Sequence, residues 1–175
     1  MRFILFLLLI PVFAQCQTVH MDKGRIAYKE SVKIEGVPKP ELYERAKQAI
    51  LKNVKAAKKE KGLENNEKDE IIMAGEMRLA STHDIVKTLQ YIMKISVKDD
   101  EYKNEIDSVY IKEARRGGKT IKIPSDELIN GMESSGNVAI DTEKQLNEID
   151  MKIQKLLHLI ERDIRKAQWP IVNSQ

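Results

Sequence analysis

The residues that could do chemistry in this sequence are few and scattered. His83 stands beside Asp84, a pairing suited to general acid–base catalysis, but neighbours in sequence rarely face each other and no serine or cysteine nucleophile pattern accompanies them. Asp99, Asp100 and Glu101 could offer oxygens to calcium, yet the alternating acids and central glycine of an EF-hand loop are missing, so this run predicts a hairpin turn. Without a catalytic triad, metal cluster or paired-carboxylate spacing, we expect no catalytic residue, no metal site, no cofactor and no enzyme activity.

The segment 115–120, with the sequence RRGGKT, invites comparison with a phosphate-binding loop. Such a loop needs a glycine where Glu113 stands, and a helix must follow it. Here a short apolar alternation, Ile121–Ile123, follows instead. We therefore interpret the segment as a flexible loop, which leads into a linker over residues 116–141 that contains a short helix.

The N-terminus predicts export. Arg2 precedes a short apolar run, and the residues up to Ala14 complete the pattern of a signal peptide over residues 1–14. The single cysteine, Cys16, has two interpretations: a lipid attachment site, or a free thiol in a disordered tail over residues 15–24. We expect a location in the periplasm or cell envelope, and contact with a membrane only if Cys16 is lipidated, as in an outer-membrane lipoprotein.

The composition argues against a nucleic-acid partner. The chain has 175 residues, of which 33% are charged, and its formal net charge is only +3. This charge is too small for a bulk attraction to a polyanion, and no aromatic residues interleave with the lysines of the basic segment that follows Pro40. We therefore expect no nucleic acid among the partners.

The first part of the chain predicts a strand followed by a helix. From Arg25 the apolar residues alternate with polar ones, which is typical of a half-buried strand. Pro40 then suits the first turn of a helix, because its missing N–H costs nothing there, and apolar residues at helical spacing carry the helix to about Lys61, before Gly62.

Three further strands are expected in a meander. Residues 71–79 alternate, with Gly75 on the inward face, where it would allow close approach of the helix or mark a bulge. Residues 89–98 alternate again, and the strand after the acidic turn changes phase, which predicts a bulge near Asp107 and Ser108. The inward residues of the second of these strands are Leu89, Tyr91, Met93, Ile95 and Val97.

The last part of the chain predicts a long amphipathic helix over residues 142–168, before a tail over residues 169–175. Thr142 and Gln145 form a capping-box signal. The apolar stripe follows a near-heptad repeat, so it could fold back on the sheet or form a coiled coil with a second copy or another envelope protein. The candidate partner-contact residues are Leu146, Ile149, Ile153, Leu156, Ile160 and Ile164.

Several of these features together resemble a known family. They are the stretch Pro40–Tyr43 at the helix start, Gly75 in the next strand, and the hairpin from Val97 to Tyr102. Over roughly residues 25–115 the chain resembles an envelope family of Gram-negative bacteria whose domain is of unknown function and has a TATA-binding-protein-like (TBP-like) fold. The resemblance implies that fold and an envelope location; it implies no activity and no DNA binding.

We therefore expect an α+β protein with a TBP-like domain over residues 25–115. Its antiparallel sheet of about four strands would have the order strand, helix, three strands, and a long C-terminal helix would follow. The expected function is that of an exported, non-enzymatic binding or scaffolding protein, acting through self-association or an unknown envelope partner. The alternative is a periplasmic carrier of a small molecule or lipid.

Overall fold

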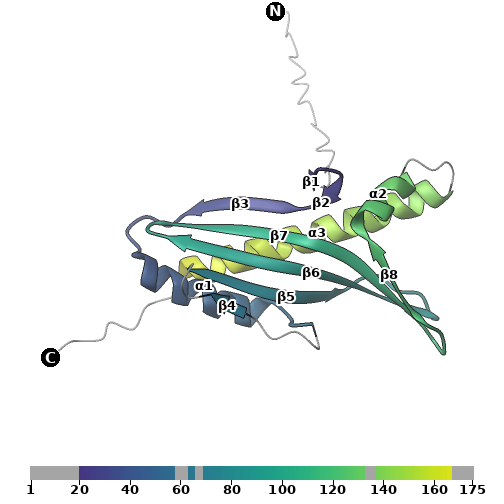
Figure 1. Cartoon of the computed structure of the whole chain (residues 1–175), viewed down its shortest axis with the longest axis horizontal. Coiled ribbons are helices and arrows are strands. Elements are labelled where there is room, and N and C mark those ends of the chain that lie inside the picture. Colours follow the sequence, from purple (N-terminus) through teal and green to yellow (C-terminus); the bar gives the residue numbers. More distant parts are fainter. Residues whose placement is uncertain (1–19, 58–62, 66–68, 133–136, 167–175) are drawn as a thin grey trace, which may run out of the picture.

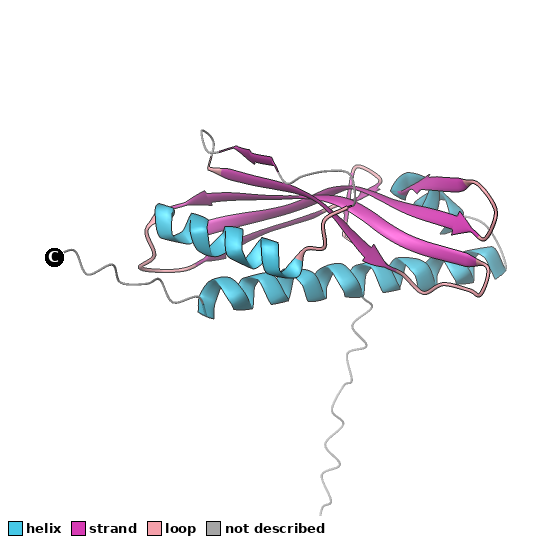
Figure 2. Ribbon diagram, turned by 90° about the horizontal axis from the view of Figure 1, so that it is seen from below, coloured by secondary structure: helices cyan, strands magenta, loops and turns pink. Residues whose placement is uncertain are grey.

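The structure is a computed structural model and describes residues 20–57, 63–65, 69–132 and 137–166. One antiparallel sheet carries helices against one of its faces (Figures 1 and 2). Its strand order is β3-β7-β6-β5-β4, and β8 also pairs with β7. In chain order the elements are β1 (Met21–Asp22), β2 (Arg25–Ile26), β3 (Tyr28–Lys33), α1 (Lys39–Asn53), β4 (Leu63–Asn65), β5 (Glu70–Arg78), β6 (Ile85–Lys98), β7 (Glu101–Arg115), β8 (Thr120–Pro124), α2 (Ser125–Met132) and α3 (Asn137–Lys166).

The hairpin between β6 and β7 turns at Asp99 and Asp100, as predicted. Asp100 has a positive φ of 58°, a conformation that aspartate tolerates better than most residues. Its carboxylate accepts the backbone N–H of Val37 at 3.1 Å, and that of Asp99 accepts the N–H of Lys39, at the start of α1, at 2.9 Å. The acidic turn therefore holds the beginning of α1 against the hairpin.

Strand β7 is divided by a bulge at the predicted place. On β6, Gln90 pairs with Tyr110 and Ile92 with Asp107, so β7 carries one residue more than β6 between these pairs. Ser108, within the bulge, has a positive φ of 51°. Residues 101–106 of β7 pair with β3, whereas residues 110–114 pair with β8. The bulge thus lies where one neighbouring strand ends and the other begins.

The long helix α3 folds back onto the sheet. In Figure 2 it runs along the sheet with α1 beside it, and the two helices are in contact. Of the two alternatives left open for the α3 stripe, the structure shows the first: the six candidate partner-contact side chains lie in the core of their own chain, where burial of apolar surface stabilises the fold. The six residues, each at most 5% exposed, are Leu146, Ile149, Ile153, Leu156, Ile160 and Ile164.

Gly75 serves a different purpose from the one expected. The group that approaches it closely is the ring of Tyr91, on the neighbouring strand β6, rather than the helix. A Cβ atom at position 75 would lie 2.4 Å from Cζ of Tyr91. The glycine therefore leaves space for the buried ring of Tyr91, which occupies the position that a side chain at residue 75 would take.

The segment after α1 also differs from the prediction. The helix ends at Asn53 instead of Lys61, because the chain becomes extended at Val54 and follows the edge of β5. There the carbonyl of Lys55 accepts the N–H of Glu76 at 2.8 Å. The sheet has six strands rather than about four, because β4 and β8 come from segments expected to be a loop and a linker. Among the described residues, none of the helices combines the length and the apolar character that crossing a membrane requires.

Candidate functional site

The face of the sheet away from α1 and α3 is a candidate contact surface. We call it the open face; Figure 1 looks onto it, with α3 behind the sheet. Side chains of successive strand residues point to opposite faces of the sheet. The residues that lie between the buried positions of β6 therefore point toward the open face. The open-face positions of β6 are Val86, Thr88, Gln90, Ile92, Lys94, Ser96 and Lys98.

On the half of the open face nearest the β6–β7 turn, charges of opposite sign alternate across the strands. The ammonium group of Lys98 lies 2.8 Å from the carboxylate of Glu101, and that of Lys94 lies 2.8 Å from Glu70. Lys29, on β3, lies 3.3 Å from Glu105. Exposed cross-strand pairs of this kind stabilise a fold only weakly, but they neutralise each other's charge, so this half is a self-compensated surface.

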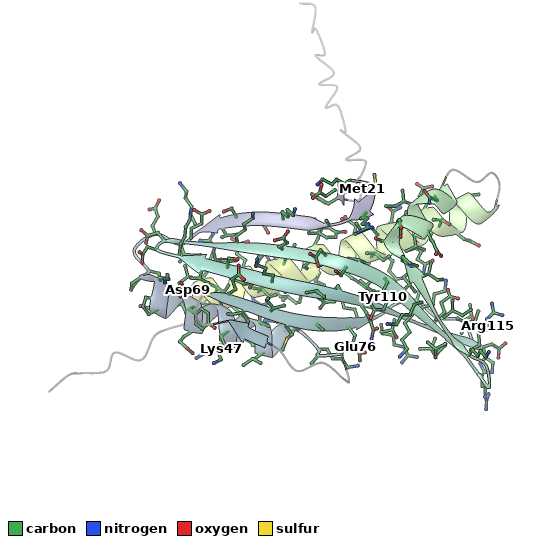
Figure 3. All side chains as sticks on the ribbon, viewed as in Figure 1. Met21, Lys47, Asp69, Glu76, Tyr110 and Arg115 are labelled. Atoms are coloured by element: carbon green, nitrogen blue, oxygen red, sulfur yellow. The ribbon has the colours of Figure 1, made fainter. Side chains whose placement is uncertain are left out.

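The β7 bulge separates this half from the rest of the open face, and two recesses meet there. The first has a volume of about 460 Å³ and the second about 890 Å³. Both are lined by Ser108, Tyr110 and Lys122, which we call the bulge site. Lys122 places its ammonium group 4.7 Å from the centroid of the Tyr110 ring, a cation–π contact. Figure 3 shows Tyr110 on the open face, with Arg115 at the far end of β7.

The groups around the bulge site are of three kinds: polar, cationic and apolar. The first recess adds the amide of Gln90, the apolar side chain of Ile92 and the ammonium group of Lys112. Together they offer hydrogen-bond donors, positive charge and a small apolar floor. In the described residues, no cluster of histidine, cysteine or acidic side chains could hold a metal ion.

A second polar cluster joins strand β3 to helix α3. The hydroxyl group of Tyr28 donates a hydrogen bond of 3.0 Å to the carboxylate of Asp150, which is 4% exposed. Nδ1 of His20 lies 3.7 Å from the same carboxylate oxygen. Burial, reinforced by the carboxylate, raises the pKa of Tyr28 well above its ordinary value of 10.0. Sequence analysis missed this contact because Asp150 is a single polar position within an otherwise ordinary amphipathic helix.

Burial also raises the pKa of two further tyrosines, Tyr91 and Tyr102, each 2% exposed or less. With Tyr28 they form a set that we call the buried tyrosines. The hydroxyl group of Tyr91 has no hydrogen-bond partner in the part of the chain that is described. Each ring contributes apolar surface to the core, and each hydroxyl group resists ionisation because an anion there would be poorly solvated.

The other candidates from the sequence have structural places. Asp84 accepts the backbone N–H of Arg116 through its own carbonyl at 3.1 Å, so it joins two loops. The RRGGKT segment forms the turn between β7 and β8, and a strand rather than a helix follows it, which rules out a phosphate-binding loop of the Walker type. Cys16 lies outside the described residues.

Comparison with known proteins gives a fold. Residues 28–112 match the family model described as Domain of unknown function (DUF4468) with TBP-like fold. A TBP-like protein from Parabacteroides distasonis superposes with a TM-score of 0.70 at 18% sequence identity, over 86% of this chain and 99% of that one. A DUF4468 family protein from Bacteroides ovatus has a TM-score of 0.63 at 15% identity, over 86% of this chain and 91% of that one. No curated protein matches the sequence at a significant level.

Proposed function

We propose that this is an exported, non-enzymatic binding or scaffolding protein of the bacterial envelope. The match of residues 28–112 to the DUF4468 family, whose function is unknown, supplies the fold but no role, so the proposal rests on other grounds. The observation that carries the proposal is the open face with its recessed bulge site. Ligand sites usually have volumes of about 300–1,000 Å³, and both recesses at the bulge site fall within this range.

We infer that a partner contacts the open face rather than the apolar stripe of α3. The apolar stripe of that helix is buried by its own sheet, so it offers a partner little surface. By contrast, the bulge site combines a hydroxyl, an aromatic ring and an ammonium group on an uncovered surface. None of these groups is a nucleophile held by a base, which supports a binding role rather than a catalytic one.

Site-specific photo-cross-linking would test this role. A benzoylphenylalanine residue in place of Tyr110 should yield a covalent adduct with an envelope component in cells of the source organism. The same residue in place of Leu51, which is 61% exposed on α1, is the matched control and should yield none. Equal adducts at both positions, or no adduct at Tyr110, would contradict a contact surface at the bulge site.

Export is supported by residues 1–14 and makes a separate prediction. The mature protein should lack this segment, and its N-terminal peptide should begin at Gln15, or at a lipid-modified Cys16. Mass spectrometry of the envelope fraction distinguishes the two, and a Cys16→Ser variant would leave the membrane only in the second case. An intact N-terminus in a cytosolic fraction would contradict export.

A carrier role is the second candidate, because the larger recess, about 890 Å³, is wide enough for a small molecule. Its wall contains Arg25, Lys29, Glu105 and Asp126, so the ligand would be polar. Native mass spectrometry of protein purified from its own envelope would reveal a bound small molecule. A mass equal to that of the bare chain would favour the scaffolding role.

A further inference from the structure

A row of positive charges crosses the open face beyond the bulge. Arg78 on β5 pairs with Thr88 on β6, Thr88 pairs with Lys112 on β7, and Lys112 pairs with Lys122 on β8. We call these four residues the basic row. They lie on the open face because their chain neighbours Leu89, Ile111 and Ile123 face the helices.

The basic row lacks the compensation present on the other half of the face. Lys112 and Lys122 stand directly opposite each other in an antiparallel pair, an arrangement that is destabilising for like charges. None of the three cations forms an ion pair with a carboxylate of the described residues. The open-face carboxylate in the next row, Glu76, is 3.0 Å from Lys55 and is therefore engaged elsewhere.

More positive charge continues along the same end of the sheet. Arg115, Arg116 and Lys119 lie at the β7–β8 turn, are exposed, and likewise have no ion-pair partner among the described side chains. An unfavourable charge pattern that the rest of the same sheet avoids is expected at functional positions rather than at purely structural ones. The feature that would relieve it is a bound anion.

We propose that the basic row binds an extended acidic segment of a partner protein, an inference that rests on the proposed binding function and names the chemistry of the partner. Neighbouring strands lie about 4.8 Å apart, so the three cations span about 14 Å across the sheet. Carboxylates on one face of an extended peptide repeat every ~6.8 Å, which allows two or three of them to meet the row.

Two other anionic partners fit the site less well. Lys112 and Lys122 line the first recess, where a narrow chain can enter but a planar membrane surface cannot. Single-stranded nucleic acid stacks its bases on exposed aromatic faces, and here one face of Tyr110 is already covered by the ammonium group of Lys122. An acidic peptide needs neither a flat surface nor a free ring.

Fluorescence polarisation with the mature full-length protein would test the proposal. The probe is a labelled ten-residue peptide of alternating glutamate and glycine, and the reference is the same peptide with glutamine for glutamate. The K112Q/K122Q variant should weaken binding of the acidic probe by about tenfold, equivalent to 1.4 kcal/mol. The matched control, K94Q/K98Q, removes the same charge from the same face and should change binding less than twofold.

Other outcomes would overturn the proposal. Equal losses in the two variants would mean that only net charge matters, and absence of binding at low salt would mean that no acidic segment is recognised. Tighter binding of an oligothymidylate or of phosphatidylglycerol vesicles would assign the row to nucleic acid or membrane. A cross-link from position 110 together with any of these results would leave the binding role standing and remove only the acidic partner.

Thermal unfolding of the same variants gives an independent readout. K112Q/K122Q should be close to the unaltered protein in stability, because the removal of two opposed like charges offsets the loss of the cation–π contact between Lys122 and Tyr110. K94Q/K98Q should be slightly less stable, because it removes two ion pairs. A marked loss of stability in K112Q/K122Q would show that the row has a structural role, which contradicts the proposal.

Discussion

Substitution of Gly75 by alanine should destabilise the fold through a steric clash with Tyr91. The new Cβ would lie 2.4 Å from Cζ and 2.5 Å from the hydroxyl oxygen of that ring. Tyr91 is only 2% exposed, and in a close-packed interior it would have to move by about 1 Å to restore normal contact. Overpacking of this kind costs about 1–3 kcal/mol, against which alanine gains about 0.5–1 kcal/mol over glycine within a strand.

The difference between these two ranges is about 0–2.5 kcal/mol. Because the clash is severe and the ring is buried, we expect a net loss of about 1–2 kcal/mol in the free energy of unfolding. For a chain of this size, it corresponds to a fall of about 2–8 °C in Tm. Urea unfolding followed by circular dichroism would measure it, with the slope of the transition unchanged because the surface exposed on unfolding is unchanged.

A double-mutant cycle makes this prediction specific to the ring. In a Tyr91→Leu background the space above residue 75 is free, so Gly75→Ala should become neutral or slightly stabilising. If Gly75→Ala costs the same in both backgrounds, the tyrosine does not occupy that space, and the account of the glycine given above is refuted. A neutral effect in the unaltered protein would refute it as well.

Three further predictions concern the helices and the titrating groups. Ile153 on α3 is fully buried, so Ile153→Ala should lower the free energy of unfolding in urea by about 2–5 kcal/mol. Met151→Ala, on the exposed face of the same helix, should have little effect. Equal small effects would mean that α3 is not part of the core. The buried tyrosines have pKa values raised above 10.0 in the folded state, so their contribution to stability is fully present below about pH 10 and is lost as the pH rises further. The urea midpoint should therefore fall as the pH is raised above about 10, and a constant midpoint would contradict the burial of their hydroxyl groups. The side-chain amide of Asn53 and, to a lesser extent, the ammonium group of Lys52 lower the pKa of Asp163 below its ordinary value of 3.8. The stability of the fold should therefore fall as the pH drops below about 4. This loss should be smaller in Asp163→Asn, and an equal loss would mean that other groups cause it.

The features visible in the sequence were those with a local physical cause. The alternation from Leu89 to Val97 follows from one buried sheet face, and the change of phase at Ser108 gave the bulge its place. Asp99 and Asp100 carried the chemistry of a tight turn. Each of these depends on a few consecutive residues, so no knowledge of distant contacts was needed.

The features that were missed depend on strand register and on hydrogen bonds between distant segments. Apolar spacing continues past Asn53, yet α1 ends there because the free edge of β5 offers backbone partners to the following residues. Strand β8 has only two apolar residues, Ile121 and Ile123, too few to show that it joins the sheet. The basic row could not be predicted from the sequence. Arg78 and Lys122 lie in the same row only because three separate strand pairings connect them across the sheet.

The hydrogen bond between Tyr28 and Asp150 shows that α3 is part of the same packed unit as the sheet. This contact affects the choice of boundaries for a recombinant fragment. The family match ends at residue 112 and includes α1, whereas α3, the long helix on the same apolar side of the sheet, begins only at Asn137. A recombinant fragment limited to the matched segment would lack α3. The apolar side chains that α3 covers would then be exposed to solvent, so the fragment should aggregate on expression. We therefore expect that a soluble recombinant form of this chain needs α3, through Lys166, in addition to the matched segment.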